Sequence, residues 1–276
     1  MPSAALRGAR FYKMTGSGND FVMFDGREIP AERITTQDIV ELCDRRHGIG
    51  ADGLVVLTPE GGTRVRMDFW NCDGSRADMC GNAALCSTRL ATRLGMVPGE
   101  GMQLVTRAGT FPTRVRAGET ESELNLPDFQ LPPRATGAHL RAGESCGFLA
   151  TVGVPHLVLE VDDFEAPDLM DRGRALRSDP ALGPAGANVN FVAHPENGRP
   201  VPMRTFERGV EGETLACGTG AVAAAVLLAH TGRAKLPVQI LTRGGKVLHI
   251  GATLSDGLAT NVWLAGEGRQ VFTGTL

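Results

Sequence analysis

The sequence lacks a strong excess of charge of either sign and any apolar segment of membrane length. Its 28 Lys and Arg residues nearly balance 31 Asp and Glu residues. The net charge of −3 therefore gives no reason to expect nucleic acid or a membrane surface as a partner. The first seven residues lack the apolar core of a signal peptide, and no later run is long enough to cross a bilayer. We therefore expect a cytoplasmic protein.

Metal-binding and disulfide patterns are also missing. The six cysteines include no C-x-x-C pair and no local Cys/His cluster, so no metal site is predicted. In a cytosolic chain of 276 residues a disulfide set is not expected either. Cys43 and Cys86 lie inside apolar helical patterns, which predicts that they are small buried side chains.

The sequence does not support a nucleotide-binding site. No G-x-x-x-x-G-K-[ST] motif occurs. The stretch 48–53 reads Gly-Ile-Gly-Ala-Asp-Gly, a literal G-x-G-x-x-G, but a helix is predicted before it and a strand after it. The dinucleotide fingerprint requires the reverse order. We therefore expect neither a nicotinamide nor a flavin cofactor.

What the sequence does have is a cysteine in front of an apolar helix, and it has this twice. Ala216-Cys217-Gly218-Thr219-Gly220 opens the run 221–229, which is apolar on every helical face and therefore predicts a buried helix. Met79-Cys80-Gly81-Asn82 opens a second apolar segment that extends to Gly95. At a helix N-terminus, unpaired backbone N–H groups and the positive end of the dipole stabilise a thiolate and can hold a ligand carboxylate.

The two cysteines are 137 positions apart, and similar offsets recur along the chain. Residues 106–109 (Thr-Arg-Ala-Gly) echo residues 242–245 (Thr-Arg-Gly-Gly) at an offset of 136. Further matches at offsets of 135 or 136 keep the same order. This regularity predicts an internal duplication whose period is far too long for a solenoid.

Short strands outnumber helices in the predicted elements and do not alternate regularly with them. This favours an α+β fold of two pseudo-symmetric domains, each a curled mixed or antiparallel sheet around a central buried helix. We predict an N-terminal domain over 1–130, to which the tail 266–276 returns, and a C-terminal domain over 131–265. The active site is predicted in the cleft between them.

Two cysteines facing one ligand from opposite sides suit a particular reaction. One thiolate can remove a proton from one face of a carbon while the opposite thiol delivers a proton to the other face, which inverts a stereocentre without a cofactor. Preorganised N–H donors on the substrate carboxylate and exclusion of water would stabilise the carbanion character that develops. A helix N-terminus lowers a cysteine pKa from its usual ~8.5, so that one thiolate and one thiol can coexist near neutral pH.

The sequence resembles the diaminopimelate epimerase family over nearly its whole length. The motifs that carry the resemblance surround both cysteines and recur between them; they lie at residues 16–21, 48–53, 71–75, 79–82, 155–156, 188–191, 207–209 and 216–220. The resemblance implies a cofactor-independent isomerase, usually a homodimer, that interconverts LL- and meso-diaminopimelate on the route to lysine. The substrate is then a small amino acid.

By the same resemblance, Cys80 and Cys217 are the two acid/base residues and Asn19 lies near the ammonium group of the reacting centre. The carboxylate there would be held by the backbone N–H groups of four residues, Gly81, Asn82, Gly218 and Thr219. The distal end of the substrate would be recognised by four side chains: Asn71, Asn188 and Arg208 on the carboxylate and Glu207 on the ammonium. An Arg fork fits a carboxylate. His156 would orient or polarise one of the cysteines.

Simpler interpretations exist for several of these residues. Glu207 and Arg208 could be an ordinary surface ion pair, His156 a satisfied buried histidine, and Asn19 a turn residue. The chain also departs from the family pattern, since many members have Asn at Val154 and some have Gln at Gly53. These departures concern substrate recognition and leave the cysteine pair intact.

Two other functions remain open on the sequence alone. A related cofactor-independent racemase would act on proline, hydroxyproline or another amino acid. The proline racemase pattern has His where this chain has Asn82, and a ring substrate offers no distal ammonium to Glu207. A protein of another class, thiol-redox or non-catalytic, would use Cys80 and Cys217 as a regulatory disulfide.

Overall fold

The chain folds into two compact units that are described separately. The computed structural model describes residues 3–97, 101–116, 118, 120–132, 140–196 and 198–276; the side chain of Cys146 lies outside this description. The first unit is Met1–Asn125 together with Ala265–Leu276, and the second is Leu126–Leu264. In the described residues strands outnumber helices, which confirms the predicted α+β class.

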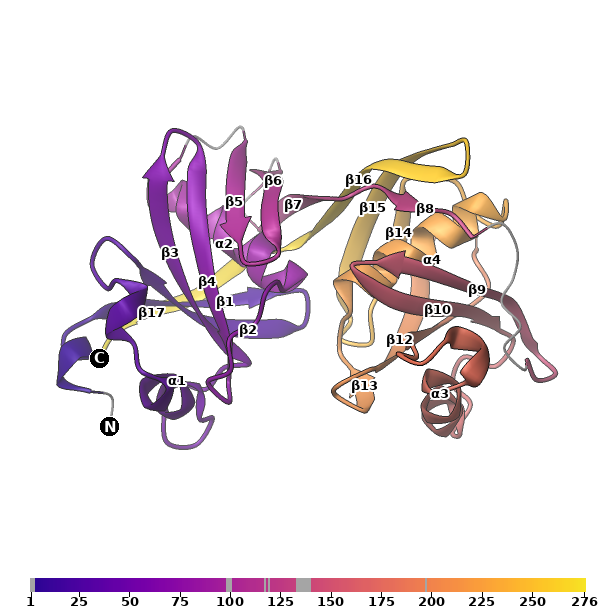
Figure 1. Ribbon diagram of the computed structural model, residues 1–276, viewed down its shortest axis with the longest axis horizontal. Helices are drawn as coiled ribbons and strands as arrows, with labels where there is room; N and C mark the ends of the chain where they lie inside the picture. Colours follow the sequence, from indigo (N-terminus) through magenta and orange to yellow (C-terminus); the bar gives the residue numbers. More distant parts are fainter. Residues whose placement is uncertain (1–2, 98–100, 117, 119, 133–139, 197) are drawn as a thin grey trace. The chain divides into compact units, whose positions relative to one another are not determined.

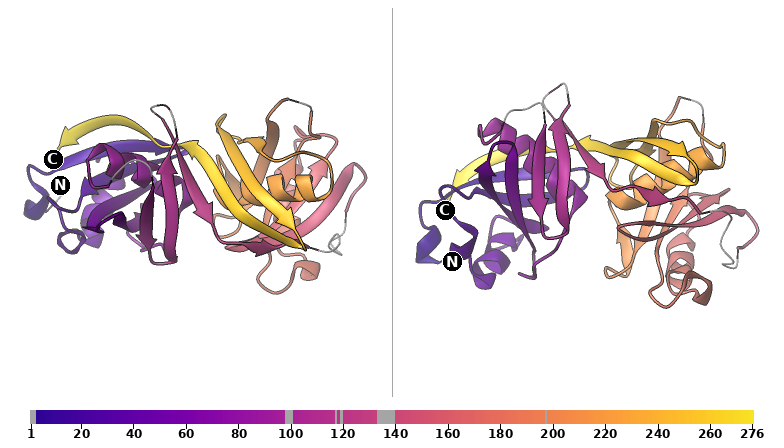
Figure 2. Two further views of the ribbon diagram at one scale, coloured as in Figure 1. Left: turned by 90° about the horizontal axis from the view of Figure 1, so that it is seen from above. Right: turned by 45° about the horizontal axis from the view of Figure 1, so that its top comes forward.

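The described residues of the first unit form two α-helices among its strands. Its elements in chain order are η1 (Ala4–Leu6), β1 (Arg10–Gly16), β2 (Asn19–Asp25), η2 (Ala31–Arg33), α1 (Thr36–Cys43), β3 (Gly53–Gly61), β4 (Arg64–Asn71), α2 (Gly81–Arg93), β5 (Met102–Thr106), β6 (Gly109–Val115), β7 (Glu121–Leu126) and β17 (Arg269–Thr275). The last strand, β17, pairs antiparallel with β1 (Figure 1), and the views in Figure 2 show the same pair. The C-terminal strand thereby completes the sheet of the N-terminal unit.

The second unit has a matching set of elements. In chain order they are β8 (Phe129–Gln130), β9 (Glu144–Val152), β10 (Val154–Val161), α3 (Leu169–Arg177), η3 (Pro180–Leu182), β11 (Asn188–Val192), β12 (Val201–Glu207), β13 (Gly212–Thr214), α4 (Gly218–His230), β14 (Val238–Leu241), β15 (Val247–Ser255) and β16 (Leu258–Glu267). The last of these, β16, continues into the first unit.

The order of strand pairing repeats between the units. In the first, β1 is antiparallel to β2, β2 parallel to β3, β3 antiparallel to β4, β4 parallel to β5, and β5 antiparallel to β6. The strands β9, β10, β11, β12, β14 and β15 follow the same sequence of pairings. The helices α2 and α4 occupy equivalent places in the two series. The internal duplication expected from the sequence is therefore confirmed at the level of topology.

The central helix of each unit is enclosed by its own strands. In the second unit α4 contacts β9, β10, β11, β14 and β15, and every residue from Gly220 to Leu228 is buried. Figure 1 shows α4 packed against β14 and β15. In the first unit α2 contacts strands from β1 to β6 and also β17. The predicted helix without a solvent-facing side is thus confirmed, because burial on all sides requires an apolar residue at each position.

The remaining helix of each unit covers the other face of the sheet. In the second unit α3 contacts β11 and β12, and its Leu176 packs in a core cluster with Val189 and Phe191. Strand residues alternate in direction, so the neighbours Asn188 and Asn190 project from the opposite face of β11. That face is the one toward α4. Polar side chains are therefore placed between β11 and the helix that begins after Cys217.

Candidate active site

Cys80 and Cys217 hold equivalent positions in the two units. Each is the N-cap of its helix, α2 or α4, with backbone φ and ψ of −143° and 119° for Cys80 and −129° and 105° for Cys217. The carbonyl oxygen of each accepts the first helical hydrogen bond, at 2.9 Å from Ala84 or Ala221. Neither side chain makes a capping hydrogen bond. The first N–H groups of each helix, including those of Gly81 and Gly218, therefore form an electropositive end next to a sulfur atom.

In the second unit a hydrogen-bonded chain leads to Cys217. The hydroxyl Oγ1 of Thr219, in the first turn of α4, lies 3.8 Å from the Cys217 Sγ and 3.0 Å from the His156 Nε2. His156 is fully buried on β10. Sequence reasoning placed His156 near a cysteine through the family resemblance. In the structure its ring reaches Cys217 by way of Thr219.

The other ring nitrogen of His156 faces Asn190. The amide Nδ2 of Asn190 lies 3.3 Å from the His156 Nδ1 and donates to the carbonyl oxygen of Leu157 at 3.2 Å. The Asn190 Oδ1 accepts a hydrogen bond of 3.0 Å from the hydroxyl of Thr205. Because Asn190 and Thr205 are opposite each other in the β11–β12 pair, the strand register creates this contact. His156 is thus a buried histidine with a partner on both sides.

His156 is held in its neutral form. Burial lowers the pKa of His156 to about 3, and the positive charge of Arg208 adds a smaller effect of the same sign. A charged imidazolium would lose its hydration in this interior, which is the physical cause of the shift. Near neutral pH the ring therefore carries one N–H group and one acceptor nitrogen.

In the first unit the residue equivalent to Thr219 is Asn82, and it has different partners. The Asn82 Nδ2 donates to the Asn19 Oδ1 at 2.7 Å, and the Asn19 Nδ2 donates to the Asp52 Oδ2 at 2.9 Å. The buried Asn82 Oδ1 has no hydrogen-bond partner among the described residues. The structure therefore brings Asn19 and Asn82 together at the start of α2.

Asn19 is hydrogen-bonded to Asp52, which belongs to a network of ion pairs. Asp20 accepts hydrogen bonds from Lys13 at 2.6 Å and from Arg45 at 2.7 Å, and Arg45 also pairs with Asp52 at 2.7 Å. Lys13, which is buried, also donates to the carbonyl oxygen of Gly50. Burial raises the pKa of Asp20, but the hydrogen bonds and charges of Arg45 and Lys13 outweigh it and bring the pKa to about 2.

The remaining predicted residues lie where strands end. Asn71 is the last residue of β4, is exposed, and donates to the Ser75 Oγ at 3.0 Å. In the second unit the buried Asn188 Oδ1 accepts from the backbone N–H of Arg208 at 2.8 Å. Asn188 is also the register partner of His156 in the β10–β11 pair. These contacts place Asn188, Arg208 and His156 in one neighbourhood of that unit.

Glu207 and Arg208 are oriented by different surroundings. The Nη1 of Arg208 donates to the carbonyl oxygen of Ala185 at 3.1 Å. Glu207 is the last residue of β12, and burial raises its pKa. A carboxylate taken out of water in this way is stabilised by a cation brought to it.

The other cysteines differ in their surroundings. Cys43 and Cys86 are buried, as predicted, and burial raises the pKa of Cys43 to about 12 and that of Cys86 well above its usual range. Cys72 is exposed. Thiols held neutral by apolar burial are poor nucleophiles, so Cys43 and Cys86 have a packing role.

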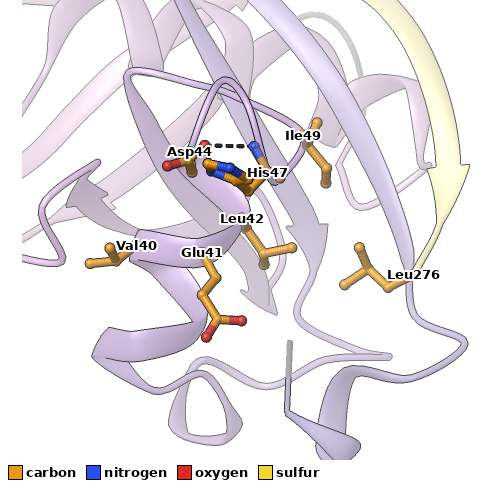
Figure 3. A pocket seen from close by; sticks show the side chains of 8 residues that line it. Val40, Glu41, Leu42, Asp44, His47, Ile49 and Leu276 are labelled. Carbon is orange, nitrogen blue, oxygen red and sulfur yellow. Dashed lines mark hydrogen bonds and ion pairs between the residues drawn. The ribbon is translucent and has the colours of Figure 1, made fainter. Parts of the chain in front are cut away.

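A surface pocket in the first unit involves a different set of residues. It lies beside the C-terminal end of α1 and the loop after it (Figure 3); its lining residues are Val40, Glu41, Leu42, Asp44, His47, Gly48, Ile49 and Leu276. None of the predicted site residues lines it. Ile49 and Leu276 pack against the core cluster of Leu42 and its neighbours, so the pocket is bounded by the core of the unit.

In the described ranges no group of three or more His, Cys, Asp or Glu side chains is placed to hold a metal ion. Within the same ranges, no helix is both long and apolar enough to span a membrane.

Sequence reasoning missed the residues that hold these side chains in place. Asn190 and Thr205 lie inside strand patterns, and Lys13, Arg45 and Asp52 are spread over forty positions. Asp52 and Asn190 lay within resemblance motifs but had no assigned role, and the further signal was periodicity. Asn188 and Asn190 are two apart in an otherwise apolar strand, which puts both amides on one face.

Comparison with known proteins gives consistent matches. The family model described as diaminopimelate epimerase matches residues 11–126 and 148–252. A diaminopimelate epimerase of Gemmatimonas aurantiaca is 44% identical over 96% of this chain and 98% of its own length. One of Aquifex aeolicus is 38% identical over 96% of this chain and 97% of its own length.

Solved structures with low sequence identity share the fold. A PhzF-family phenazine biosynthesis protein of Bacillus anthracis matches with a TM-score of 0.72 at 14% identity, covering 98% of this chain and 99% of its own. A hydroxyproline epimerase of Agrobacterium vitis matches with a TM-score of 0.64 at 18% identity, covering 100% and 94%. At these identities the likeness shows the two-domain fold alone.

Proposed function

The chain belongs to the diaminopimelate epimerase family of isomerases, and we propose that it interconverts LL- and meso-diaminopimelate. In this proposal Cys80 and Cys217 are the two acid/base residues and no cofactor takes part. The observation that carries it is the presence of one N-cap cysteine in each of two topologically repeated units. The two units are then the N- and C-terminal domains.

The proposed reaction is a proton transfer at each face of one carbon. The thiolate of one cysteine takes the proton from the α carbon, and the electron pair of the C–H bond is left as carbanion character on the substrate. The thiol of the other cysteine gives its proton to the opposite face, which completes the inversion and leaves that sulfur as the thiolate. This scheme requires that the domains present both sulfur atoms to one substrate, as in the cleft predicted from the sequence.

The helix starts supply the stabilisation that such a weak carbon acid needs. We assign the substrate carboxylate at the reacting centre to the backbone N–H groups of Gly81, Asn82, Gly218 and Thr219. Fixed N–H donors aimed at developing charge stabilise it without reorganisation. Asn19 serves the ammonium group in the first domain, where the buried Asn82 Oδ1 offers a further acceptor.

The distal end of the substrate is assigned to residues at the strand ends. Arg208, Asn71 and Asn188 are proposed to bind the distal carboxylate, and Glu207 the distal ammonium. The raised pKa of the half-buried Glu207 supports this, because an ammonium ion would relieve the cost of its charge. His156 acts through Thr219 rather than on the substrate. The absence of an amide at Val154 leaves this recognition set smaller than the family pattern.

Isotope exchange tests the proposal directly. Reduced protein incubated with LL-diaminopimelate in deuterated water should exchange the α hydrogen and form the meso isomer. Cys80→Ala and Cys217→Ala should each abolish inversion, and turnover retained in both would rule out two-base chemistry. Added pyridoxal phosphate should change nothing. Reduced and oxidised protein run in parallel test the thiol-redox alternative, in which no exchange occurs in either state.

Racemisation of proline or hydroxyproline is the second candidate, and the fold shared with a hydroxyproline epimerase is the observation that favours it. The same exchange assay run on proline and hydroxyproline decides between them. Exchange with a ring substrate and none with diaminopimelate would replace the first proposal. We further propose that the enzyme works in the cytoplasm and that it is a homodimer. Sedimentation of the purified protein would test the homodimer.

A further inference from the structure

We propose that Asn190 is a positioning residue that sets the tautomer of His156, so that the Thr219 hydroxyl donates to Cys217 and makes this cysteine the resting thiolate. The inference rests on the proposed function and deepens it. It assigns different roles to the two cysteines before substrate binds. Asn190 touches neither sulfur nor substrate in this scheme and acts through His156.

The orientation of the Asn190 amide is fixed by its neighbours. A carbonyl oxygen can only accept, so the Asn190 atom 3.2 Å from the Leu157 oxygen is the amide nitrogen. The other hydrogen of that nitrogen points to the His156 Nδ1 at 3.3 Å. The Asn190 oxygen accepts from the Thr205 hydroxyl. All of these groups are buried, so reversing the amide would place its oxygen against the Leu157 carbonyl oxygen and lose the hydrogen bond between them.

A donor facing the Nδ1 decides where the histidine proton is. His156 is neutral and has a single N–H, and the Nδ1 must accept from Asn190, so the proton is on the Nε2. The Nε2–H group then donates to the Thr219 Oγ1 at 3.0 Å. A second proton on the Nδ1 would meet the Asn190 N–H directly. The geometry thus opposes protonation for a reason independent of burial.

The direction continues through Thr219 to the sulfur. The Thr219 oxygen accepts from His156, and in the proposed arrangement its own O–H donates to the Cys217 Sγ at 3.8 Å. A sulfur atom that accepts a hydrogen bond is favoured as the thiolate. In this arrangement the Asn190 amide sets the direction of the hydrogen bonds from His156 to Thr219 and from Thr219 to Cys217.

The first unit differs at the position equivalent to Thr219. Position 82 carries an amide where position 219 carries a hydroxyl, and the Asn82 nitrogen is directed to Asn19. The Asn82 oxygen can accept but cannot donate. The repeat therefore carries a hydroxyl beside Cys217 at the position where it carries an amide after Cys80, and this difference suits a free enzyme with its thiolate on Cys217 and its thiol on Cys80.

The tautomer can be read without any substitution. Nitrogen-15 NMR of the wild-type imidazole should show His156 with a protonated Nε2 and an unprotonated Nδ1 near neutral pH. In Asn190→Leu, which has the same number of side-chain heavy atoms and no donor, the ring should lose this single tautomer. A wild-type His156 protonated on the Nδ1, or on both nitrogens, would overturn the proposal.

The thiolate assignment is tested by site-resolved alkylation. Iodoacetamide labelling across pH, read by peptide mapping, should give Cys217 a lower apparent pKa than Cys80 in the same sample. Thr219→Val should slow labelling of Cys217 by about tenfold near neutral pH, the size expected for losing a hydrogen bond to a charged acceptor. Thr219→Ser should restore the rate, and Asn190→Leu should slow it. Cys80 should be unaffected in all three variants.

Two labelling results would overturn the proposal. One is an apparent pKa of Cys217 equal to or above that of Cys80, and the other is a Cys217 profile unchanged in Thr219→Val. Far-ultraviolet circular dichroism shows whether each variant is folded. If Asn190→Leu is not folded, the comparison of Thr219→Val with Thr219→Ser tests the proposal. These measurements need no substrate. They can fail while diaminopimelate exchange is still observed, and the exchange assay can fail while they succeed.

Discussion

Gly220 lies so close to Asn190 that a β carbon at position 220 would come within 2.3 Å of the Asn190 Oδ1. The same β carbon would lie 3.1 Å from the Cys217 Sγ. Glycine in the first turn of α4 is therefore what allows a buried amide to pack beneath the helix that carries the cysteine. A side chain there must displace Asn190, and with it the contact to His156.

Gly220→Ala should accordingly lower both stability and activity. Overpacking a well-packed interior costs about 1–3 kcal/mol, so the melting temperature should fall by several degrees. Displacement of Asn190 should also reduce kcat by at least an order of magnitude if the tautomer matters. Gly251→Ala is the matched control, because a β carbon there meets nothing within 4 Å. Equal melting temperatures for the two variants would contradict the steric argument.

The half-buried carboxylate of Glu207 should appear in the acid limb of the pH profile. Burial raises its pKa, so as the pH falls the group takes up a proton at a higher pH than an ordinary glutamate. Once neutral it can no longer pair with an ammonium ion, and kcat/KM for diaminopimelate should fall through that pKa. The acid limb should therefore begin above the range of an exposed glutamate.

Glu207→Gln isolates this effect. The variant keeps the shape of the side chain without its charge, so KM should rise by about tenfold or more while the acid limb of kcat/KM disappears. Steady-state kinetics from pH 5 to 8 would measure both. If the limb persists in Glu207→Gln, another group is responsible for it and the assignment of the distal ammonium is lost.

Much of the fold could be read from the sequence because its strongest signals are local. An apolar run without a polar face predicted the buried α4, and the Cys-Gly pairs predicted both helix starts. The capping box formed by Thr35 and Asp38 at α1 is likewise a short-range pattern. Such signals depend on neighbours within one helical turn, so a single sequence contains all of them.

The contacts that orient the side chains of the candidate site join residues far apart in the sequence. His156 meets Thr219 across 63 positions and Asn190 across 34, and Asn19 meets Asp52 across 33. They depend on strand register, which no local pattern encodes. The family resemblance supplied roles for His156 and Asn19. Asn190 lay within the motif at 188–191 without an assigned role, and its contacts became apparent only once β10, β11 and β12 were placed side by side.

A third prediction concerns stability at the far end of α4. Glu160 is fully buried and accepts hydrogen bonds from His194 and Arg233. The hydrogen bond with Glu160, followed by that with Asp162, raises the pKa of His194. Protonated His194 therefore stabilises the folded state below its unfolded pKa, and this contribution is lost as the pH rises through the folded pKa.

His194→Gln should therefore lower the melting temperature most at acidic pH. The difference between wild type and variant should be largest near pH 5.5 and should shrink above the folded pKa of His194. Thermal melts at half-unit steps from pH 5 to 9 would show this. Melting curves of the two proteins that stay parallel over the whole range would mean that the protonation of His194 does not contribute.

The last prediction concerns the ion pairs of Asp20 with Lys13 and Arg45. Hydrogen bonds from Arg45 and Lys13 overcome the effect of burial and bring the pKa of Asp20 to about 2, below its unfolded value. The stabilisation is present above the unfolded pKa and is lost as the pH falls from about 4 to 2. Asp20→Asn should cost roughly 2 kcal/mol at pH 7 and much less near pH 2 in urea titrations. Asp78→Asn is the control, because its ion pair with Arg107 at 3.1 Å is exposed and such pairs contribute little. Equal losses for the two variants at pH 7 would show that Asp20 gains nothing from Lys13 and Arg45.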